Sequence, residues 1–318
     1  MTRPPSKREL QRQRRAERTP SLYSPRVWPA WIGVGFAWLV ARLPLGLLLW
    51  LGTQLGNLVY ALGGSRRHIT ETNLALCFPE LSEPERNSMA RRVFQEVATG
   101  MLELCIAWLN PKRNLRQHCV VHGGEHLRAA QALGRGVVLV GGHYAVLDTI
   151  AQPLAEFDNI NLMYRHNKNP VFEWLQVHGR KHYFDGVYER QDTRNILRAL
   201  KQGHSIWYAA DQDYGAKQSV FAPFFGVQAA TITATARLAK FNQSPVVILS
   251  QFRDRETMTW HLHFTEAVEG YPSGDDVADA TRMNALLEEQ IRKDPTQYLW
   301  LHKRFKTQPE GAPNLYKR

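Results

Sequence analysis

Short apolar runs alternate with segments of helical length from residue 63 to the C-terminus, and this alternation constrains the fold more than any other feature. When a helix connects two strands of one sheet, it carries the chain back across the sheet, so that the second strand runs parallel to the first. A parallel sheet needs helices on both faces to bury it. The sequence therefore predicts an α/β fold with a largely parallel sheet covered by helices on both faces.

The boundaries of these elements follow from apolar periodicity and from residues that start and stop helices. A capping-box pattern at residues 82–85 predicts the start of a long amphipathic helix that ends near Leu109. Asp192 is expected to cap a later helix, and Gly179 to close another. The remaining helices are expected at residues 145–156, 170–178, 192–201, 231–241 and 280–293, and the strands at residues 136–142, 160–164, 182–188, 205–210, 246–252 and 260–265.

An apolar segment at residues 27–62 precedes this domain, and Arg42 is its only formally charged residue. Its tryptophan and tyrosine rings favour a membrane interface. The first apolar run, residues 27–41, is shorter than the roughly 20 residues that cross a bilayer. Two membrane arrangements remain open: a tilted helix with Arg42 at its end, or two helices that meet at Pro44 within one leaflet. The third possibility is a helical pair buried in a soluble domain.

The chain is expected to consist of a basic tail at residues 1–26, a membrane anchor at residues 27–62 and a larger domain at residues 63–318. The formal net charge is +11, and the tail supplies more than half of it, because it holds eight Lys or Arg residues against two Glu. This excess favours an anionic partner: nucleic acid, acidic lipid or acidic protein. A mean hydropathy of −0.38 argues against a protein with many membrane spans.

The most informative motif is Gly141-Gly142-His143-Tyr144-Ala145-Val146-Leu147-Asp148, which follows a wholly apolar strand. Open α/β sheets bind ligands at the carboxyl ends of their strands. If His143 immediately precedes a helix, Asp148 lies about one turn along, with its side chain tilted back toward the imidazole. The carboxylate would then fix the tautomer and leave the other ring nitrogen to accept a proton from a hydroxyl. The alternative is a histidine that caps the helix and an unrelated surface aspartate.

Asp211 and Asp213 follow a second apolar strand and precede three phenylalanines within residues 221–225. These residues could form a polar rim beside an apolar slot for an acyl chain, or a turn followed by core aromatics. Four basic residues near neighbouring strand ends could bind phosphate or phosphopantetheine, or could simply be solvated: Arg165, Lys168, Arg180 and Lys181.

Several other chemistries are disfavoured. Three widely spaced cysteines, Cys77, Cys105 and Cys119, argue against a disulfide framework and are typical of a reducing compartment. The string of residues 122–126 (His-Gly-Gly-Glu-His) matches a zinc-peptidase pattern, but its two glycines would cost about 2 kcal/mol of helix stability. No metal is therefore expected. The chain lacks a G-x-S-x-G elbow, a P-loop and a dinucleotide fingerprint, and no cysteine lies near His143, which favours direct transfer over a covalent intermediate.

Sequence blocks in a characteristic order extend over nearly the whole chain from about Tyr23. They lie at residues 73–80, 137–143, 164–165, 169–170, 174–176, 179–180, 207–209, 211, 213–215 and 300–307. In these blocks the chain resembles the late acyltransferases of lipid A biosynthesis, a branch of the lysophospholipid acyltransferase superfamily. Within that branch it is most similar to the lauroyltransferases.

This resemblance implies that residues 63–318 are an acyltransferase domain. The 3-hydroxyl of a hydroxyacyl chain on a lipid A precursor of the Kdo2-lipid IVA type would attack an acyl thioester on acyl carrier protein. His143 would be the general base and Asp148 its partner, while Arg165, Arg180, Asp211 and Asp213 would bind substrate. The chain departs from the family at Asp148, where this branch usually has Glu, and this departure leaves the geometry of the pair open.

The resemblance also implies the partners and the location. Acyl carrier protein and the phosphorylated acceptor are both anionic, which suits a basic rim, and neither a metal nor a dissociable cofactor is needed. The protein would act on the cytoplasmic face of a bacterial inner membrane. Two alternatives remain: an acyltransferase for another lipid acceptor, such as a glycerolipid or aminolipid, and a non-catalytic protein that binds acidic lipid through its tail.

Overall fold

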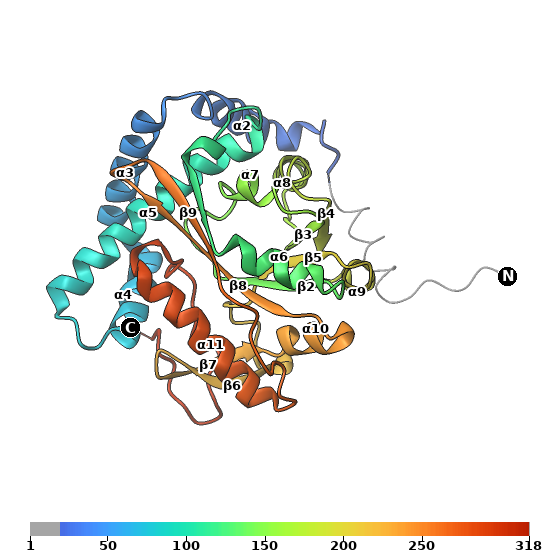
Figure 1. Cartoon of the computed structure of the whole chain (residues 1–318). Helices are drawn as coiled ribbons and strands as arrows, with labels where there is room; N and C mark the ends of the chain where they lie inside the picture. The colour runs from blue at the N-terminus through green and yellow to red at the C-terminus, as the bar shows by residue number, and fades with distance from the viewer. Residues whose placement is uncertain (1–19, 318) are drawn as a thin grey trace.

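The computed structural model describes residues 20–317 (Figure 1). The predicted basic tail therefore lies mostly outside the described residues. The helices are η1 (Pro25–Val27), α2 (Trp28–Val40), α3 (Leu45–Leu62), α4 (Gly64–Cys77), α5 (Glu83–Leu109), η2 (Arg116–His118), α6 (Gly124–Ala132), α7 (Ala151–Leu154), α8 (Pro170–Arg180), α9 (Thr193–Lys201), η3 (Ala216–Gln218), α10 (Ala234–Asn242), α11 (Asp276–Lys293) and η4 (Pro295–Gln297). The strands are β1 (Cys119–His122), β2 (Val137–Gly141), β3 (Ile160–Tyr164), β4 (Gly186–Glu189), β5 (Ser205–Ala209), β6 (Ser219–Phe224), β7 (Val227–Ile232), β8 (Val246–Asp254) and β9 (Thr259–Phe264).

Seven strands form one sheet in the order β1-β9-β8-β2-β5-β3-β4. All neighbours in it are parallel except β8 and β9. The central strand β2 is buried along its whole length. Val137 and Leu139 pack into one core cluster and Val138 and Val140 into another, on the opposite face. The predicted fold class, a largely parallel sheet buried on both faces, is confirmed.

The predicted helix at residues 145–156 is wrong over its first half, where turns lead into the single turn of α7. The backbone hydrogen bonds of this region go elsewhere. Ala145 N donates to Gln297 O (2.8 Å), and Leu299 N donates to His143 O (2.9 Å). Residues 143–145 therefore pair with the segment after η4 and are not available to start a helix.

Other differences are smaller. Helix α8 does not close at Gly179 but continues to Arg180, because a glycine allows the helix to press against Trp108, where a Cβ would lie 2.7 Å from the indole. Strand β4 begins at Gly186 instead of residue 182. The predicted helix at residues 231–241 begins only at Ala234, because residues 227–232 form the second strand of the antiparallel β6–β7 hairpin.

The N-terminal apolar segment forms two helices, α2 and α3, and Pro44 caps the start of α3. The break between the two helices lies at residues 41–44, beside Arg42. Leu48 is fully buried in the main core, whereas one face of each helix is exposed and apolar. Among the described residues, α3 is the one helix that is long and apolar enough to cross a membrane.

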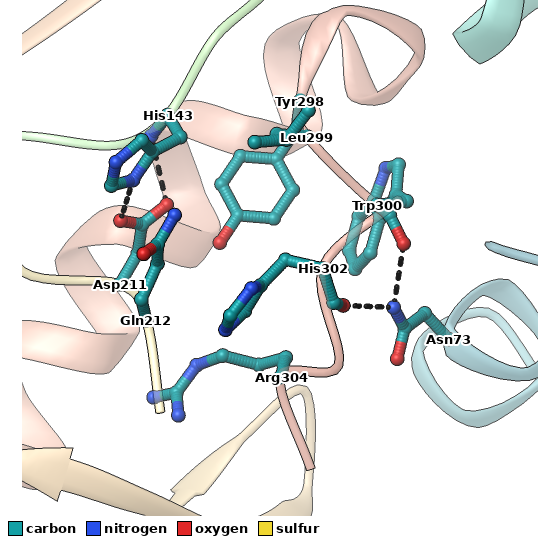
Figure 2. A pocket seen from close by; sticks show the side chains of 9 residues that line it. All are labelled: Asn73, His143, Asp211, Gln212, Tyr298, Leu299, Trp300, His302 and Arg304. Carbon is teal, nitrogen blue, oxygen red and sulfur yellow. Dashed lines mark hydrogen bonds and ion pairs between the residues drawn. The ribbon is translucent and has the colours of Figure 1, made fainter. Parts of the chain in front are cut away.

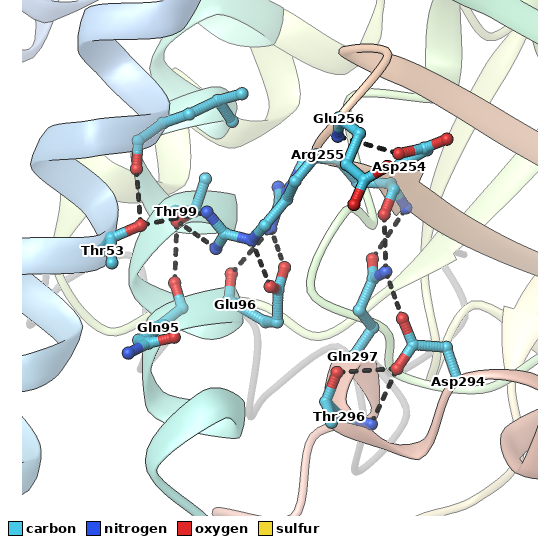
Figure 3. A network of polar contacts seen from close by, with 12 residues as sticks. Thr53, Gln95, Glu96, Thr99, Asp254, Arg255, Glu256, Asp294, Thr296 and Gln297 are labelled. Atoms are coloured by element: carbon cyan, nitrogen blue, oxygen red, sulfur yellow. Dashed lines mark hydrogen bonds and ion pairs between the residues drawn. The ribbon is translucent and has the colours of Figure 1, made fainter. Parts of the chain in front are cut away.

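A buried polar network ties α5 to the end of β8 (Figure 3). Glu96 of α5 forms ion pairs with both Arg253 and Arg255. Glu103, about two helical turns further along α5, lies 2.5 Å from Arg253 Nη1. Arg255 Nη2 also donates to Thr99 Oγ1 (3.1 Å). Removing one partner of such a network would leave an uncompensated buried charge, so the network fixes the position of α5 on the sheet.

Candidate active site

The site lies at the carboxyl end of β2, where the chain turns through Gly141 and Gly142 to His143. A Cβ at Gly142 would lie 3.1 Å from the ring of Tyr144, so the turn is tight enough to favour glycine. Tyr144 forms an isolated antiparallel bridge with Tyr298. Gly100 of α5 supports the turn from another side, since a Cβ there would lie 1.9 Å from Ala145 O. The catalytic candidate is therefore held between α5 and the C-terminal segment.

Asp211 contacts His143 twice (Figure 2). Its Oδ2 accepts from the backbone N–H of His143 (2.8 Å), and its Oδ1 lies 2.6 Å from His143 Nδ1. Strand register explains this contact, because Gly141 of β2 pairs with Ala209 of the neighbouring parallel strand β5. His143 lies two residues after Gly141, and Asp211 lies two residues after Ala209. The two side chains therefore leave the same edge of the sheet side by side.

The pair is electrostatically coupled. Burial opposes protonation of His143, but the charge and hydrogen bond of Asp211 outweigh burial and raise the pKa of the imidazole. Burial alone would raise the pKa of Asp211, but the contacts with His143, together with the hydroxyl of Tyr298, lower that pKa well below its usual range. Asp211 is thus a carboxylate, so the neutral imidazole carries its proton on Nδ1. Nε2 is then left as a base, and the imidazole side chain is 24% exposed.

The predicted contact between His143 and Asp148 is wrong. Asp148 instead forms a bidentate ion pair with Arg180, in which Nε and Nη2 donate to its two oxygens at 2.7 and 2.9 Å. The prediction assumed a helix that starts immediately after His143, and turns occupy that segment. Both members of the pair are largely buried, with exposed side-chain fractions of 4% for Asp148 and 11% for Arg180. The structure brings Asp148 together with Arg180 and brings His143 together with Asp211.

A cavity of about 930 Å³ opens beside His143. Arg165 and Arg180, both predicted to bind substrate, line it. No Asp or Glu is among the described residues that line it, and three further cations do so that sequence reasoning missed: Arg190, Lys217 and Arg237. Arg190 directly follows β4, so its place at the carboxyl edge of the sheet was an available signal, whereas Lys217 in η3 and Arg237 in α10 gave none. A cavity with this lining has the charge to hold an anionic ligand.

The cavity also has an apolar part. Leu147, Leu162, Met163, Trp207 and Ile232 contribute to its wall. The three phenylalanines of residues 221–225 do not line it. Phe224 and Phe225 are buried in a cluster that includes Tyr298 and Trp300, so these two are core aromatics, whereas Phe221 in β6 is half-buried.

Asp213, also predicted to bind substrate, faces away from the cavity. Its Oδ2 accepts from Thr307 N (2.6 Å), and its Oδ1 accepts from the hydroxyl of Thr307 (2.9 Å). It therefore ties β5 to the C-terminal segment. Lys168 and Lys181 do not line the cavity either. Among the described residues no cluster of His, Cys, Asp or Glu is arranged to hold a metal ion, and the three cysteines are free thiols.

Behind the His143–Asp211 pair, the C-terminal segment forms a small polar pocket (Figure 2). Asn73 of α4 holds this segment, since its Nδ2 donates to Trp300 O (2.7 Å) and to His302 O (2.8 Å). Tyr298, His302 and Arg304 line the pocket together with His143 and Asp211. The blocks around residues 73–80 and 300–307 thus meet in space and support the site from behind.

Comparisons with known proteins show the family of the chain. A family model described as bacterial lipid A biosynthesis acyltransferase matches residues 15–307. The lipid A biosynthesis lauroyltransferase of Escherichia coli K12 is 39% identical to the chain, with 93% of this chain and 97% of the relative covered. The palmitoleoyltransferase of the same organism is 36% identical, over 92% and 95%. A lipid A biosynthesis acyltransferase of Haemophilus influenzae is 34% identical, over 93% and 96%. The chain therefore belongs to the family of bacterial lipid A biosynthesis acyltransferases and is an acyl-transferring enzyme of lipid A biosynthesis.

Proposed function

We propose that the enzyme transfers a fatty acyl group from acyl carrier protein to a hydroxyl of a hydroxyacyl chain on a Kdo2-lipid IVA-type precursor, with His143 as the general base. The observation that carries this proposal is the His143–Asp211 pair, which lies at the edge of a large cavity rich in cations. A base next to a site for an anionic lipid is what this reaction needs. An alternative acceptor, such as a glycerolipid or aminolipid, has no comparable support, because the relatives are named for lipid A.

In the proposed reaction, Nε2 of His143 takes the proton of the acceptor hydroxyl as its oxygen attacks the thioester carbonyl carbon. Asp211 holds the ring and stabilises the imidazolium that forms. The tetrahedral intermediate then collapses, the carbon–sulfur bond breaks, and the imidazolium returns the proton to the leaving thiolate. The products are an ester on the acceptor and free thiol on the carrier, with no covalent acyl-enzyme.

Arg180 is suited to stabilise negative charge next to this base. Its Nε and Nη2 are used by Asp148, whereas Nη1 has no hydrogen bond to any described residue. Arg180 lines the same cavity as His143, and its charge acts to lower the pKa of that imidazole. We assign Arg180 to the oxyanion or to a phosphate of the substrate, and Asp148 to holding its guanidinium.

The location at the cytoplasmic leaflet of the inner membrane is also part of the proposal. The exposed apolar faces of α2 and α3 support contact with lipid, and three free thiols fit a reducing compartment. Acyl carrier protein as donor is supported by its strong negative charge, which complements the cationic cavity. These features make one consistent arrangement: lipid acceptor from the membrane side and acylated carrier from the cytoplasm.

Acyl transfer by purified protein in vesicles tests the proposal, with acylated carrier protein and a Kdo2-lipid IVA-type acceptor, and mass spectrometry of the product. His143→Ala should lower transfer by more than about 100-fold, since a general base contributes that much. Acyl-CoA as donor and a lysoglycerolipid as acceptor serve as comparison substrates. A folded His143→Ala variant that retains most activity would contradict the base assignment, and faster transfer to the lysoglycerolipid would contradict the acceptor.

A further inference from the structure

The packing of α3 against α5 determines how the N-terminal helices can lie on a bilayer. A Cβ at Gly52 would lie 2.4 Å from Thr99 Oγ1, and one at Gly56 would lie 2.4 Å from the Cα of Gln95. Small residues four positions apart allow two helices to approach closely. Residue numbers rise along α3 as they fall along α5, so the two helices run antiparallel and side by side (Figure 1).

Polar groups occupy this interface next to the middle of α3. Thr53 Oγ1 accepts from Arg255 Nη1 (3.0 Å), and Asn57 Oδ1 accepts from Arg91 Nε (2.7 Å). Arg255 also pairs with Glu96, as Figure 3 shows. Arg91 is exposed, and the side chain of Arg255 is 31% exposed. Charged groups that reach water therefore lie directly beside the centre of α3.

The opposite face of α3 is apolar and uncovered. Its exposed large apolar side chains are Leu47, Trp50, Leu55, Leu58, Val59 and Leu62, and α2 adds Trp28, Ile32, Phe36, Trp38 and Leu39; Gln54 is exposed among them. Basic residues stand at the ends of the two helices, with Arg26 before α2, Arg42 between the helices and Arg66 after α3, all exposed. An apolar face bordered by cations is typical of helices that lie in the interface of an anionic leaflet.

We propose that α2 and α3 dock on a single leaflet of an anionic bilayer and that neither helix crosses it. This inference rests on the proposed function only for the presence of a membrane. If the 18 residues of α3 crossed, Thr53 would lie near the middle of the hydrocarbon and would carry Arg255 and Glu96 there. Charged groups at that depth are strongly disfavoured. The 13 residues of α2 are too short to cross, at about 20 Å.

An orientation in which both helices lie on the surface of one leaflet accounts for both the apolar face and the charged network. The apolar face of α3 enters the leaflet, and its glycine face stays on α5 with the charged network on the aqueous side. The chain that precedes α2 then remains on the same side of the bilayer as His143. A crossing α3 would instead place these two parts of the molecule on opposite sides, and this difference makes the proposal testable.

Labelling with a membrane-impermeant maleimide distinguishes the two topologies. Two single-cysteine variants, Ser21→Cys and Ala312→Cys, are made in full-length chain in which Cys77, Cys105 and Cys119 are replaced by serine. In intact spheroplasts of a Gram-negative host we expect neither cysteine to react, and both to react equally after lysis. Labelling of one position but not the other in intact spheroplasts would overturn the proposal.

A depth measurement provides the second readout. Leu47, Gln54 and Ala61 lie seven residues apart on the exposed side of α3, and nitroxide labels at cysteines placed there report depth in phosphatidylglycerol-rich vesicles. A surface helix gives three nearly equal, shallow depths, whereas a crossing helix makes position 54 the deepest. Labels that report no lipid contact, as in a dimer of two chains that covers α3, would also overturn the proposal. Acyl transfer by the same variants is measured separately, and its loss would count only against the proposed function.

Discussion

At the scale of single residues, His143 is fixed from two sides. The carboxylate of Asp211 accepts hydrogen bonds from the backbone N–H and the ring of His143, and the backbone carbonyl of His143 accepts from Leu299 N. The backbone is thus held together with the imidazole. A base held in this way has little freedom to lose when substrate arrives, which is a condition for effective proton transfer.

The first prediction concerns Asp211→Asn. The general base must be neutral, so wild-type kcat/KM should fall as pH decreases through the pKa of His143, which Asp211 raises above the ordinary value of about 6.5. In Asp211→Asn that pKa falls, so the acid limb of the profile should move to lower pH, while the maximal rate drops about 100-fold or more. A pH–rate profile of kcat/KM checks both. Asp185→Asn, an exposed carboxylate, is the control, and an unmoved acid limb would contradict the pairing.

The second prediction compares two buried tyrosines that contact each other at the site. The hydroxyl of Tyr298 helps lower the pKa of Asp211, whereas the hydroxyl of Tyr144 is buried with no hydrogen-bond partner among the described residues. Tyr298→Phe should therefore lower kcat about tenfold with little change in KM, because it removes the hydroxyl that hydrogen-bonds to the Asp211 carboxylate and stabilises its charged form. Tyr144→Phe should leave kcat within about twofold. Equal effects of the two changes would show that Tyr298 acts only through packing.

At the scale of elements, the alternation of apolar runs and helical segments was enough to predict a largely parallel sheet, although strand β1 was missed and a short turn at residues 255–258 joins the antiparallel strands β8 and β9. The partner of His143 could not be predicted in this way. It depends on the order of strands, which places β5 beside β2, and on a register that no local pattern contains. The expected helix after His143 was wrong for the same reason, because the turns depend on contacts that are distant in the sequence. Backbone groups of residues 143–145 bond to Gln297 and Leu299, about 150 residues away.

The third prediction tests how α5 supports the turn that carries His143. A Cβ at Gly100 would overlap Ala145 O, so Gly100→Ala has to displace either α5 or the turn that carries His143. We expect kcat to fall at least tenfold and the free energy of unfolding to fall by about 1–3 kcal/mol. Chemical denaturation and acyl-transfer kinetics measure the two effects. Gly33→Ala in α2, where nothing lies within 4 Å of the added carbon, should change neither.

At the scale of the whole molecule, positive charge is concentrated in two places, the N-terminal tail and the cavity. Arg165, Arg190, Lys217 and Arg237 form no ion pair within residues 20–317. Their charge therefore remains available to a ligand. The two concentrations of charge have different expected effects: the cavity cations should act on binding of the acceptor, and the tail should act on membrane binding that depends on salt.

The fourth prediction concerns the cavity. Arg237→Gln and Lys217→Gln should each raise KM for the phosphorylated acceptor about five- to tenfold, because each removes a charge from its binding site. The effect on kcat should be smaller. Steady-state kinetics with varied acceptor measure both. Arg194→Gln removes an exposed cation that does not line the cavity, and the same rise in KM for this control would indicate a general effect of net charge.

The fifth prediction concerns the tail. Replacing its seven Lys and Arg residues between positions 3 and 18 by Gln should weaken binding to anionic vesicles, most strongly at low salt. kcat at saturating substrate should stay within about twofold of the unmodified chain. Vesicle sedimentation at several salt concentrations measures binding. Binding that does not depend on salt in the unmodified chain would rule out the tail as an electrostatic contact.

The burial of Leu48 has a practical consequence for anyone who wishes to prepare the enzyme without lipid. Its side chain belongs to the same cluster as Val146 and Ile150, which lie a few residues beyond His143. A fragment trimmed at residue 62 to improve solubility would lose that side chain, would uncover Thr99 of α5 and would remove the contact of Thr53 with Arg255. Helices α2 and α3 are thus part of the packed structure, and preparations of the enzyme should retain them.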